Sequence, residues 1–578
     1  MAVARHRVGR LILGTAVFLL ALLVLLPSGP QHLITGQPPL QKTHPKVRFQ
    51  PSSFDWTSVP QRYPVSSIQP LPTGRPKQHL HPVQHAFAGY VHDATTQRRQ
   101  QAVRAAFVRC WDSYKAHAWL RDELAPVSGG GKTTFGGWAA TLVDSLDTLW
   151  IMDLRDEFYT AAAAAAAQLD WANTTDTAIN VFETTIRHLG GLLGAYDLSG
   201  EPALLEKAIE LGNMLYMAFD TPNRIPGFWL NFQDAKQGLQ TAGTNDPSAS
   251  PCSLSLEFTR LSLLTGDSKY YDAVARITDF LERTQDQSKL PGMWPKLINF
   301  HDEAVDRENG FTMGALADSL YEYLPKMAAL LGGQIPSYDK MYRAAMEVAK
   351  KHLLFRPMAA EDDTEGRDVL FVGDAYVHPD RIDHVPEGQH LSCFAGGMFA
   401  LGGKLFDIPD HISIGERLAR GCAWAYNAFP TGLMPEIFNL IPCSSIEGPC
   451  LWDEERWQKE GDTKLRKGFK DARDPRYILR PEAIESVFLL YRMTGRADFR
   501  DLAWRMFEAL MEATKTPLAN SAIADVTVEG ETIKLDSMES FFLSETLKYF
   551  YLIFSPPDLI NLDDFVFNTE AHPFRRAK

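Results

Sequence analysis

The sequence contains few cysteines and no cysteine pair with the spacing of a metal site. Six cysteines occur in 578 residues, and none belongs to a C-x-x-C pair. This excludes a disulfide-rich scaffold and gives no sign of structural zinc. The chain also lacks a long basic run, and its net charge is −13. Binding to nucleic acid requires stripes of lysine and arginine and is therefore not expected.

The composition is that of a globular protein. Hydrophobic residues make up 45% of the chain and charged residues 22%, which differs from the composition of disordered chains. At about 150 residues per domain the length suggests three or four domains. A large closed helical or α/β enzyme can nevertheless use most of this length as one unit.

The N-terminal sequence predicts the cellular compartment in which the protein acts. Arg5, Arg7 and Arg10 precede an unbroken apolar run at 11–26, and no basic residue follows it until Lys42. This pattern predicts a type II signal-anchor, with residues 1–10 as a cytosolic tail and 11–26 as a membrane-spanning helix. A cleaved signal peptide is the alternative. Either interpretation brings the rest of the chain into the lumen of the secretory pathway.

A proline-rich segment follows the apolar run. Residues 27–82 contain 12 of the 36 prolines, and apolar residues show little periodicity there. Such a segment is typical of an extended, disordered tether. We therefore expect a stem at 27–99 and a catalytic domain at 100–578.

The body of the chain repeats one helical unit. Apolar residues recur at i, i+3, i+4 and i+7, and similar breaks such as Leu198-Ser-Gly, Leu264-Thr-Gly and Met493-Thr-Gly separate the helices. Six helical hairpins result, and the leftover helices at 102–118 and 539–554 would form a seventh. Uneven spacing favours a closed all-α toroid with apolar inner helices and amphipathic outer ones. Strands are expected to be minor, with one β-hairpin at 525–535.

Acidic residues occur in the helices predicted to lie inside. They are Glu183, Glu257, Asp318, Glu482, Glu485 and Glu545. Any single acid in a first turn can serve the helix dipole, and Arg187 can pair with Glu183 four residues earlier. Parallel inner helices would, however, bring the whole set to one mouth of the toroid. A bowl of carboxylates is what glycoside hydrolysis requires, with one acid for the leaving oxygen and one base for water.

Seven segments then resemble a known family. They are the segment at 135–152, Phe-Glu-Thr-Thr-Ile-Arg (182–187), Ala-Asp-Ser-Leu-Tyr-Glu-Tyr-Leu (317–324), His-Leu-Ser-Cys-Phe (390–394), Arg-Pro-Glu-Ala-Ile-Glu-Ser (480–486), the segment at 545–554 and Phe-Asn-Thr-Glu-Ala-His-Pro (567–573). Together they resemble class I α-1,2-mannosidases, glycoside hydrolase family 47. The resemblance implies an (α/α)7 barrel and inverting removal of terminal α-1,2-linked mannose from high-mannose N-glycans.

The resemblance also implies roles for individual residues. Glu183 matches the general acid, acting through water, Glu482 a general-base candidate, and Asp318 a third catalytic carboxylate. Thr569 matches the ligand of a Ca²⁺ ion, whose remaining ligands would be waters and sugar hydroxyls. The residues that match the lining of the mannose pocket are Arg187, Glu257, His390, Arg480, Glu485, Phe541, Glu545 and Glu570.

The resemblance to the family extends to the cysteines. Cys393 and Cys422 match a disulfide of the family, and Cys443 and Cys450 are candidates for a second one. Cys110 and Cys252 are expected to be free. Asn173-Thr-Thr is the only N-glycosylation sequon. The expected protein is a monomer in the Golgi or endoplasmic reticulum, held in the membrane by its N-terminal helix.

Two alternatives and one refinement remain at the level of sequence. The barrel could belong to a lectin-like quality-control protein that binds misfolded glycoproteins with little hydrolysis, or to another toroidal glycosidase of different linkage specificity. Leu316 stands where enzymes of the endoplasmic reticulum that remove one specific mannose carry Arg. Leu cannot hydrogen-bond to several sugars of one branch, as Arg can, and so does not fix a single orientation of the glycan. We therefore expect progressive trimming of several α-1,2-mannoses.

Overall fold

The structure is a computed structural model that describes residues 44 and 46–577. The predicted cytosolic tail, the predicted anchor at 11–26 and the first part of the predicted stem lie outside these residues. Among the helices that are described, none is both long enough and apolar enough to cross a membrane. The description below concerns the unit that begins at residue 45.

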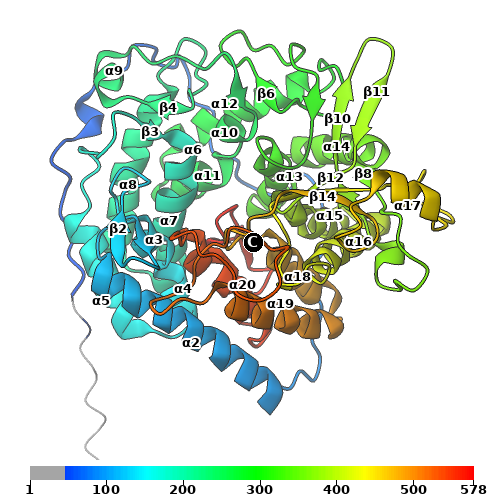
Figure 1. The fold of residues 1–578 in the computed structure, drawn as a ribbon. Helices are drawn as coiled ribbons and strands as arrows, with labels where there is room; N and C mark the ends of the chain where they lie inside the picture. Colours follow the sequence, from blue (N-terminus) through cyan, green and yellow to red (C-terminus); the bar gives the residue numbers. More distant parts are fainter. Residues whose placement is uncertain (1–43, 45, 578) are drawn as a thin grey trace, which may run out of the picture. The chain divides into compact units, whose positions relative to one another are not determined.

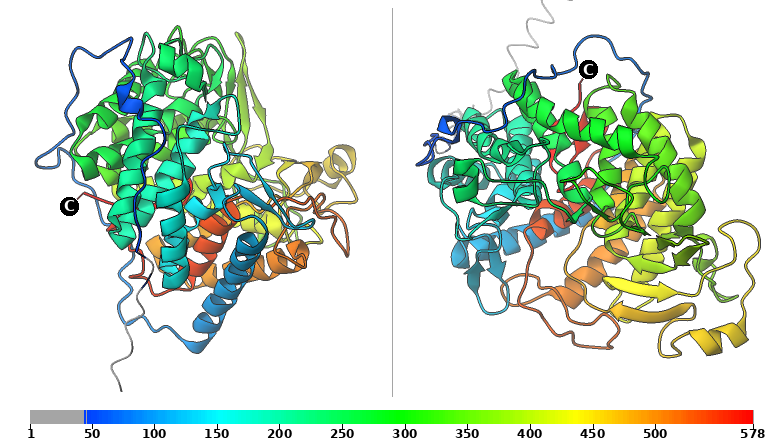
Figure 2. Two further views of the ribbon diagram at one scale, coloured as in Figure 1. Left: turned by 90° about the vertical axis from the view of Figure 1, so that its left-hand side faces the viewer. Right: turned by 90° about the horizontal axis from the view of Figure 1, so that it is seen from above.

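Seven helical pairs form a closed ring in the described part of the chain (Figures 1 and 2). The inner helices are α4 (Leu146–Ile151), α7 (Gly190–Ser199), α11 (Ser255–Thr265), α13 (Asp318–Leu330), α15 (Ala395–Leu405), α18 (Glu482–Thr494) and α20 (Leu547–Ile553). Their outer partners are, in the same order, α5 (Arg155–Gln168), α8 (Pro202–Tyr216), α12 (Ser268–Thr284), α14 (Ser337–His352), α16 (Pro409–Tyr426), α19 (Asp498–Thr514) and α2 (Ala94–His117).

The ring closes through its first and last members. Each inner helix contacts the next, and η6 (Phe542–Thr546), which precedes α20, contacts α4. Helix α2 packs against α20. The predicted pairing of the first and last helices, and with it the count of seven hairpins, is confirmed.

The recurring glycines end inner helices, as the sequence predicts. Gly200, Gly266 and Gly495 follow α7, α11 and α18 with φ values of 69°, 74° and 73°. This left-handed conformation favours glycine and lets the chain turn into the outer helix. In α18 every residue from Ala483 to Met493 is buried, whereas the outer helix α14 buries one face, made of Tyr338, Met341, Tyr342, Ala345, Met346 and Ala349. The division into apolar inner and amphipathic outer helices is therefore confirmed.

Strands are short, antiparallel and confined to the connections. Two-stranded pairs are β1 (Glu123–Ala125) with β2 (Gly130–Lys132), β3 (Ile179–Asn180) with β4 (Trp229–Leu230), β5 (Asp246–Pro247) with β6 (Leu297–Ile298), β8 (Leu354–Phe355) with β9 (Phe371–Val372), and β15 (Phe565–Phe567) with β16 (Pro573–Arg575). Three-stranded sheets are β11 (Ile382–Val385)–β10 (Asp374–Val377)–β7 (Gly310–Phe311) and β12 (Glu387–Gln389)–β13 (Ile437–Leu440)–β14 (Phe469–Asp474). Strands β15 and β16 contact inner helices α13 and α7 and so bring the C-terminus into the ring.

The β-hairpin predicted at 525–535 is not a regular one. Only an isolated antiparallel bridge joins Ile523 to Lys534, and Gly530 turns the chain with a φ of 85°. Ile533 in this loop is 71% exposed. The alternation of apolar and polar residues therefore does not correspond to a buried face, and without one a ladder has little to stabilise it.

The predicted stem requires a larger correction. Residues 46–93, here called the strap, lie against the barrel, and α2 begins at Ala94 rather than near residue 100. Backbone N–H groups of the strap donate to carboxylates of the barrel, including Arg62 to Asp220 (2.8 Å) and Val83 to Asp563 (2.6 Å). Trp56 and Val83 are buried. The described part of the predicted disordered tether is therefore an ordered part of the catalytic unit.

Candidate functional site

The predicted acids lie at the starts of inner helical segments. Glu183 ends the short helix α6 (Val181–Glu183), and Glu257, Asp318 and Glu482 lie in the first turns of α11, α13 and α18. Glu545 lies in the π-helical turn η6. The charges of Glu482, Glu485 and Glu570 all act on Glu545, so these carboxylates share one bowl. Of the six predicted acids, Glu482, Glu485 and Glu545 thus come together in the structure.

Glu183 lies on one side of the bowl. Asn180 accepts a hydrogen bond from the Glu183 backbone N–H (3.0 Å) and so caps its helix. The chain continues in a second π-helical turn, η2 (Thr184–Leu189), a distortion that often marks functional sites. Within this turn Arg187 donates to Glu183 (Nε–Oε2, 2.8 Å) and also pairs with Glu570 (3.0 Å).

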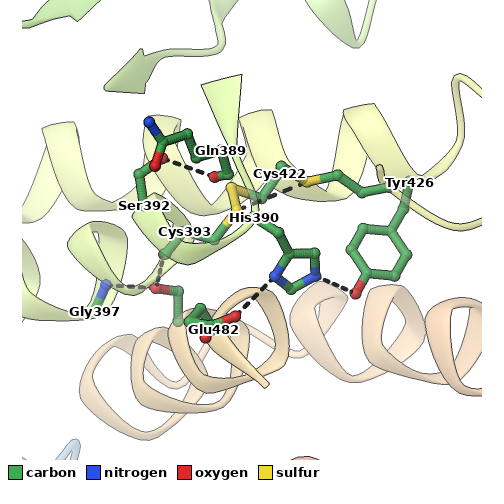
Figure 3. Close-up of a disulfide and its surroundings, with 10 residues drawn as sticks. Gln389, His390, Ser392, Cys393, Gly397, Cys422, Tyr426 and Glu482 are labelled. Carbon is green, nitrogen blue, oxygen red and sulfur yellow. Dashed lines mark hydrogen bonds and ion pairs between the residues drawn. A yellow bond between two sulfur atoms is a disulfide. The ribbon is translucent and has the colours of Figure 1, made fainter. Parts of the chain in front are cut away.

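Glu482 lies on the other side and is held more tightly. His390 contacts Glu482 (Nδ1–Oε2, 2.8 Å), and its second ring nitrogen contacts the Tyr426 hydroxyl (2.8 Å; Figure 3). Burial raises the pKa of Glu482, but the His390 hydrogen bond and the Arg480 charge outweigh this effect and lower the pKa below its ordinary value. Glu482 therefore stays ionised, as a general base must.

A disulfide supports the Glu482 side. Cys393, three residues after His390, is bonded to Cys422, which lies one helical turn before Tyr426 on α16 (Figure 3). His390 and Tyr426, which contact each other, thus each lie within four residues of one cysteine of the same bridge. The predicted pairs Cys393–Cys422 and Cys443–Cys450 are confirmed, and Cys110 and Cys252 are free and buried.

Phe541 joins the two sides. The guanidinium groups of Arg187 and Arg480 lie 5.8 Å and 6.0 Å from the centroid of its ring. Arg480 also pairs with Glu436 (2.5 Å) and approaches Glu482 (3.7 Å). One buried aromatic ring therefore orients both arginines of the bowl.

Asp318 has the environment of a proton donor. Its carboxyl group is half-buried at the start of α13. Burial, together with the negative charges of Glu322 and Glu482, raises its pKa to about 7. Asp318 and Glu482 therefore differ in protonation near neutral pH, which is the arrangement that acid–base catalysis requires.

A second group of carboxylates surrounds Thr569. Glu257 accepts hydrogen bonds from Tyr323 (2.8 Å) and Asn568 (2.7 Å), while the Tyr323 hydroxyl also accepts from the Thr569 N–H (3.3 Å). The second carboxylate oxygen of Glu257 is buried without a partner among the described residues. Burial raises the pKa of Glu485 to about 8, and the negative charges of Glu322 and Glu482 add to this effect. Burial also raises the pKa of Glu570 to about 8, together with the negative charges of Asp144 and Glu183.

This chemistry fits a hard cation, although the side chains alone do not form a complete cage. All the groups concerned are oxygen donors, which Ca²⁺ prefers, and a cation would offset the repulsion among the carboxylates. No three His, Cys, Asp or Glu side chains in the described part of the chain are arranged as a ready-made metal site. An ion here would need waters or substrate among its ligands.

Beneath the bowl lies a layer of buried ion pairs. Asp147 contacts Lys548 (2.8 Å) and His572 (2.7 Å), and Asp144 contacts Ser540 and approaches Arg187 (3.9 Å). All these groups are fully or almost fully buried. They support the residues above them, and Arg187 connects this layer to the bowl through its contact with Glu183.

Sequence reasoning missed several residues of the site. They are Phe135, Tyr323, Tyr426, Glu436 and Asn568. Phe135 lies on Arg187 (4.5 Å), and Asn568 hydrogen-bonds to Glu257. Both belong to segments that had been singled out, so their position was a usable signal. Tyr426 and Glu436 come from segments without a distinctive pattern and reach the bowl only through the fold.

Comparison with known proteins agrees with this geometry. Glycosyl hydrolase family 47 matches residues 106–576. An endoplasmic reticulum mannosyl-oligosaccharide 1,2-alpha-mannosidase of Homo sapiens is 37% identical over 485 residues, which cover 82% of this chain and 64% of the relative. The chain thus spans less than two thirds of that relative's length. A mannosyl-oligosaccharide alpha-1,2-mannosidase of Coccidioides posadasii is 34% identical over 84% of this chain and 92% of its own.

A solved structure has the same architecture. The alpha-1,2-mannosidase from Trichoderma reesei superposes with a TM-score of 0.74 at 31% identity, covering 83% of this chain and 99% of its own. The family match spans far more than half of the chain and includes every acid of the bowl. The chain therefore belongs to glycosyl hydrolase family 47.

Proposed function

We propose that this protein removes terminal α-1,2-linked mannose from high-mannose N-glycans with inversion at the anomeric carbon. The observation that carries the proposal is the pair of carboxylates in one bowl, where Glu183 is open to solvent and Glu482 is held by His390 and Arg480. A base and an acid are thus both available. The names of the relatives indicate the sugar and the linkage.

In this proposal Glu482 accepts a proton from the attacking water. His390 and Arg480 keep its carboxylate ionised and oriented. Glu183 is 30% exposed, so water can reach it and pass a proton to the leaving oxygen. Asp318 is the second candidate donor, and its ionisation would end activity above about pH 7.

The remaining bowl residues bind the mannose. Glu257, Glu485, Glu545 and Glu570 offer acceptors for sugar hydroxyls, Arg187 and Arg480 offer donors, and Phe541 offers an apolar face. Thr569, with its backbone carbonyl and hydroxyl, would hold Ca²⁺. The ion would supply coordination to sugar hydroxyls. The unpartnered oxygen of Glu257 beside Thr569 supports this assignment.

We also propose a site of action in the secretory pathway, where high-mannose N-glycans occur. The apolar run at 11–26 would anchor the chain with its catalytic domain in the lumen, and the protein would act as a monomer. Asn173, exposed in its sequon, should then carry a glycan that a glycosidase such as endoglycosidase H or peptide N-glycosidase removes. A chain starting at residue 45 should be soluble and active, whereas one starting at residue 94 should lose stability with the strap.

Leu316 favours progressive trimming. It lies two residues before Asp318, is 44% exposed and has a left-handed backbone with a φ of 80°. Its carbonyl accepts from the Ala249 N–H (2.9 Å), which holds this conformation. An apolar side chain here offers no hydrogen bonds that would fix one branch of the glycan, so several α-1,2-mannoses should be removed in turn.

One experiment tests the proposal at several levels. The nine-mannose glycan is digested, the products are resolved by isomer over time, and the anomer first released is identified by nuclear magnetic resonance. We expect β-mannose, several successive products, and loss of activity on chelation that Ca²⁺ restores. Binding without release of mannose would instead support a lectin-like quality-control protein. Arrest at one eight-mannose isomer would refute progressive trimming.

A further inference from the structure

Trp229 is an exposed tryptophan at the rim of the bowl. Its side chain is 59% exposed, although tryptophan is largely buried in most proteins. The neighbouring Phe228 packs edge-on against it, with ring centroids 5.3 Å apart. The indole is thus supported from behind while much of its surface remains open to solvent. Tryptophan combines a large apolar face with a polar edge, which suits contact with a ligand that is apolar on one side and wet on the other.

The strand register places Trp229 beside the Glu183 side of the bowl. Strands β3 and β4 pair so that Asn180 lies directly opposite Trp229. Side chains directly opposite each other in an antiparallel pair lie on the same face of the sheet. Asn180 also caps the helix that carries Glu183. One residue therefore connects the exposed indole to the carboxylate.

A cavity of about 740 Å³ runs between these residues. Its lining includes Phe135, Asn180, Glu183 and Trp229, together with the hydroxyl side chains Thr134 and Thr175. Phe135 lies on Arg187, so the inner end of the cavity reaches the site of the reaction. Hydroxyl and amide groups beside aromatic rings suit a neutral sugar, which has both hydroxyls and an apolar face.

We propose that Trp229 is a stacking platform for a mannose of the same glycan that lies beyond the linkage being cleaved. This inference rests on the proposed function and adds a second binding point outside the bowl. The bowl recognises the terminal mannose, and the platform contacts the part of the glycan that leaves. A long glycan should therefore bind more tightly than a disaccharide that ends before the platform.

The test compares two substrates and two substitutions. Trp229→Ala should raise the KM for the nine-mannose glycan by about tenfold, the size expected when one stacked aromatic contact is lost, while kcat changes little. The KM for the disaccharide mannosyl-α-1,2-mannose should change much less, so the ratio of the two KM values rises. Trp229→Phe keeps a ring and should restore most of the affinity.

A control separates this effect from damage to the fold. Leu451 is 84% exposed and lies in the loop before α17 (Glu454–Glu460), so Leu451→Ala should leave both KM values unchanged. An equal rise of both KM values in Trp229→Ala, a fall in kcat alone, or no effect would overturn the proposal. If the unmodified protein neither binds nor cleaves either substrate, the proposed function itself fails.

Discussion

The two sides of the bowl hold their carboxylates in different ways. On one side the Glu183 side chain is 30% exposed, and its hydrogen bond comes from Arg187 within the same helical segment. On the other side the Glu482 side chain is 12% exposed and is held by His390 from a distant part of the chain. Tyr426 and a disulfide support that histidine.

The difference matches two chemical tasks. The proposed base must be ionised and correctly oriented before it accepts a proton, and a buried, supported histidine favours both. An acid that works through water needs an opening to solvent, which the Glu183 side provides. The π-helical turns that carry Arg187 and Glu545 lie on segments that shape the bowl. The following predictions test this contrast, from the largest expected effect to the smallest.

Removing either carboxylate should have the largest effect. Glu482→Gln and Glu183→Gln should each lower kcat by about 10²–10⁴-fold, since each removes a proton-transfer group. Circular dichroism and thermal unfolding should show an intact fold in both variants. Full activity in Glu482→Gln would contradict its assignment as the base.

Removing His390 should affect the base without removing it. Because the His390 hydrogen bond helps to lower the pKa of Glu482, His390→Ala should raise that pKa. Glu482 then becomes protonated at higher pH, so the acidic limb of the kcat/KM profile should move to higher pH and kcat should fall by about 10²-fold. Arg104→Ala, which alters a contact on the outer helix α2, is the control. An unshifted acidic limb would show that His390 does not set the charge of Glu482.

The two disulfides form a matched pair for a third test. Their cysteines are separated by 29 and 7 residues. Loop entropy gives about 3–4 kcal/mol of stabilisation for Cys393–Cys422 and about 2 kcal/mol for Cys443–Cys450. Replacing both cysteines of a pair by Ala should lower the free energy of unfolding by these amounts. Only loss of the first should also lower kcat, by about tenfold. Equal effects of the two losses on kcat would show that the Cys393–Cys422 bridge has no special role in orienting His390.

Tyr426→Phe should have the smallest effect. It removes one hydroxyl contact with His390 (2.8 Å) and leaves the ring in place. We expect a loss of about 1 kcal/mol in transition-state stabilisation, or roughly fivefold in kcat. A loss as large as that of His390→Ala would instead mean that the hydroxyl fixes the tautomer of the histidine.

Much of the fold and the acids of the bowl were predictable. Apolar periodicity and glycine breaks gave the hairpins, because local sequence controls where helices end. Acids in helices predicted to be buried marked the bowl, since an unpartnered charge there is costly. Resemblance to the family, rather than periodicity, supplied Thr569 and the Cys393–Cys422 pair, and the structure shows that bridge.

The strap and several site contacts were not predictable, for one common reason. Arg62 and Val83 of the strap bind Asp220 and Asp563 of the barrel, and Tyr426 reaches His390 across the fold. The strap resembles a tether because its own residues form no core. What orders it is a set of carboxylates, backbone carbonyls and apolar side chains of the barrel, and no local pattern reveals partners so far away in the chain.

The pairing of α2 with α20 has a consequence for how the chain folds during synthesis. Helix α2 leaves the ribosome early with apolar residues such as Phe107 and Trp111 on its inner face, but its partner α20 is made after almost all of the catalytic domain. The residues that meet in these contacts lie far apart in the sequence, and contacts of this kind form slowly. The intermediate hairpins can assemble in order, yet the apolar face of α2 stays uncovered until the last helix arrives. We therefore expect ring closure to be a late event in the folding of this chain.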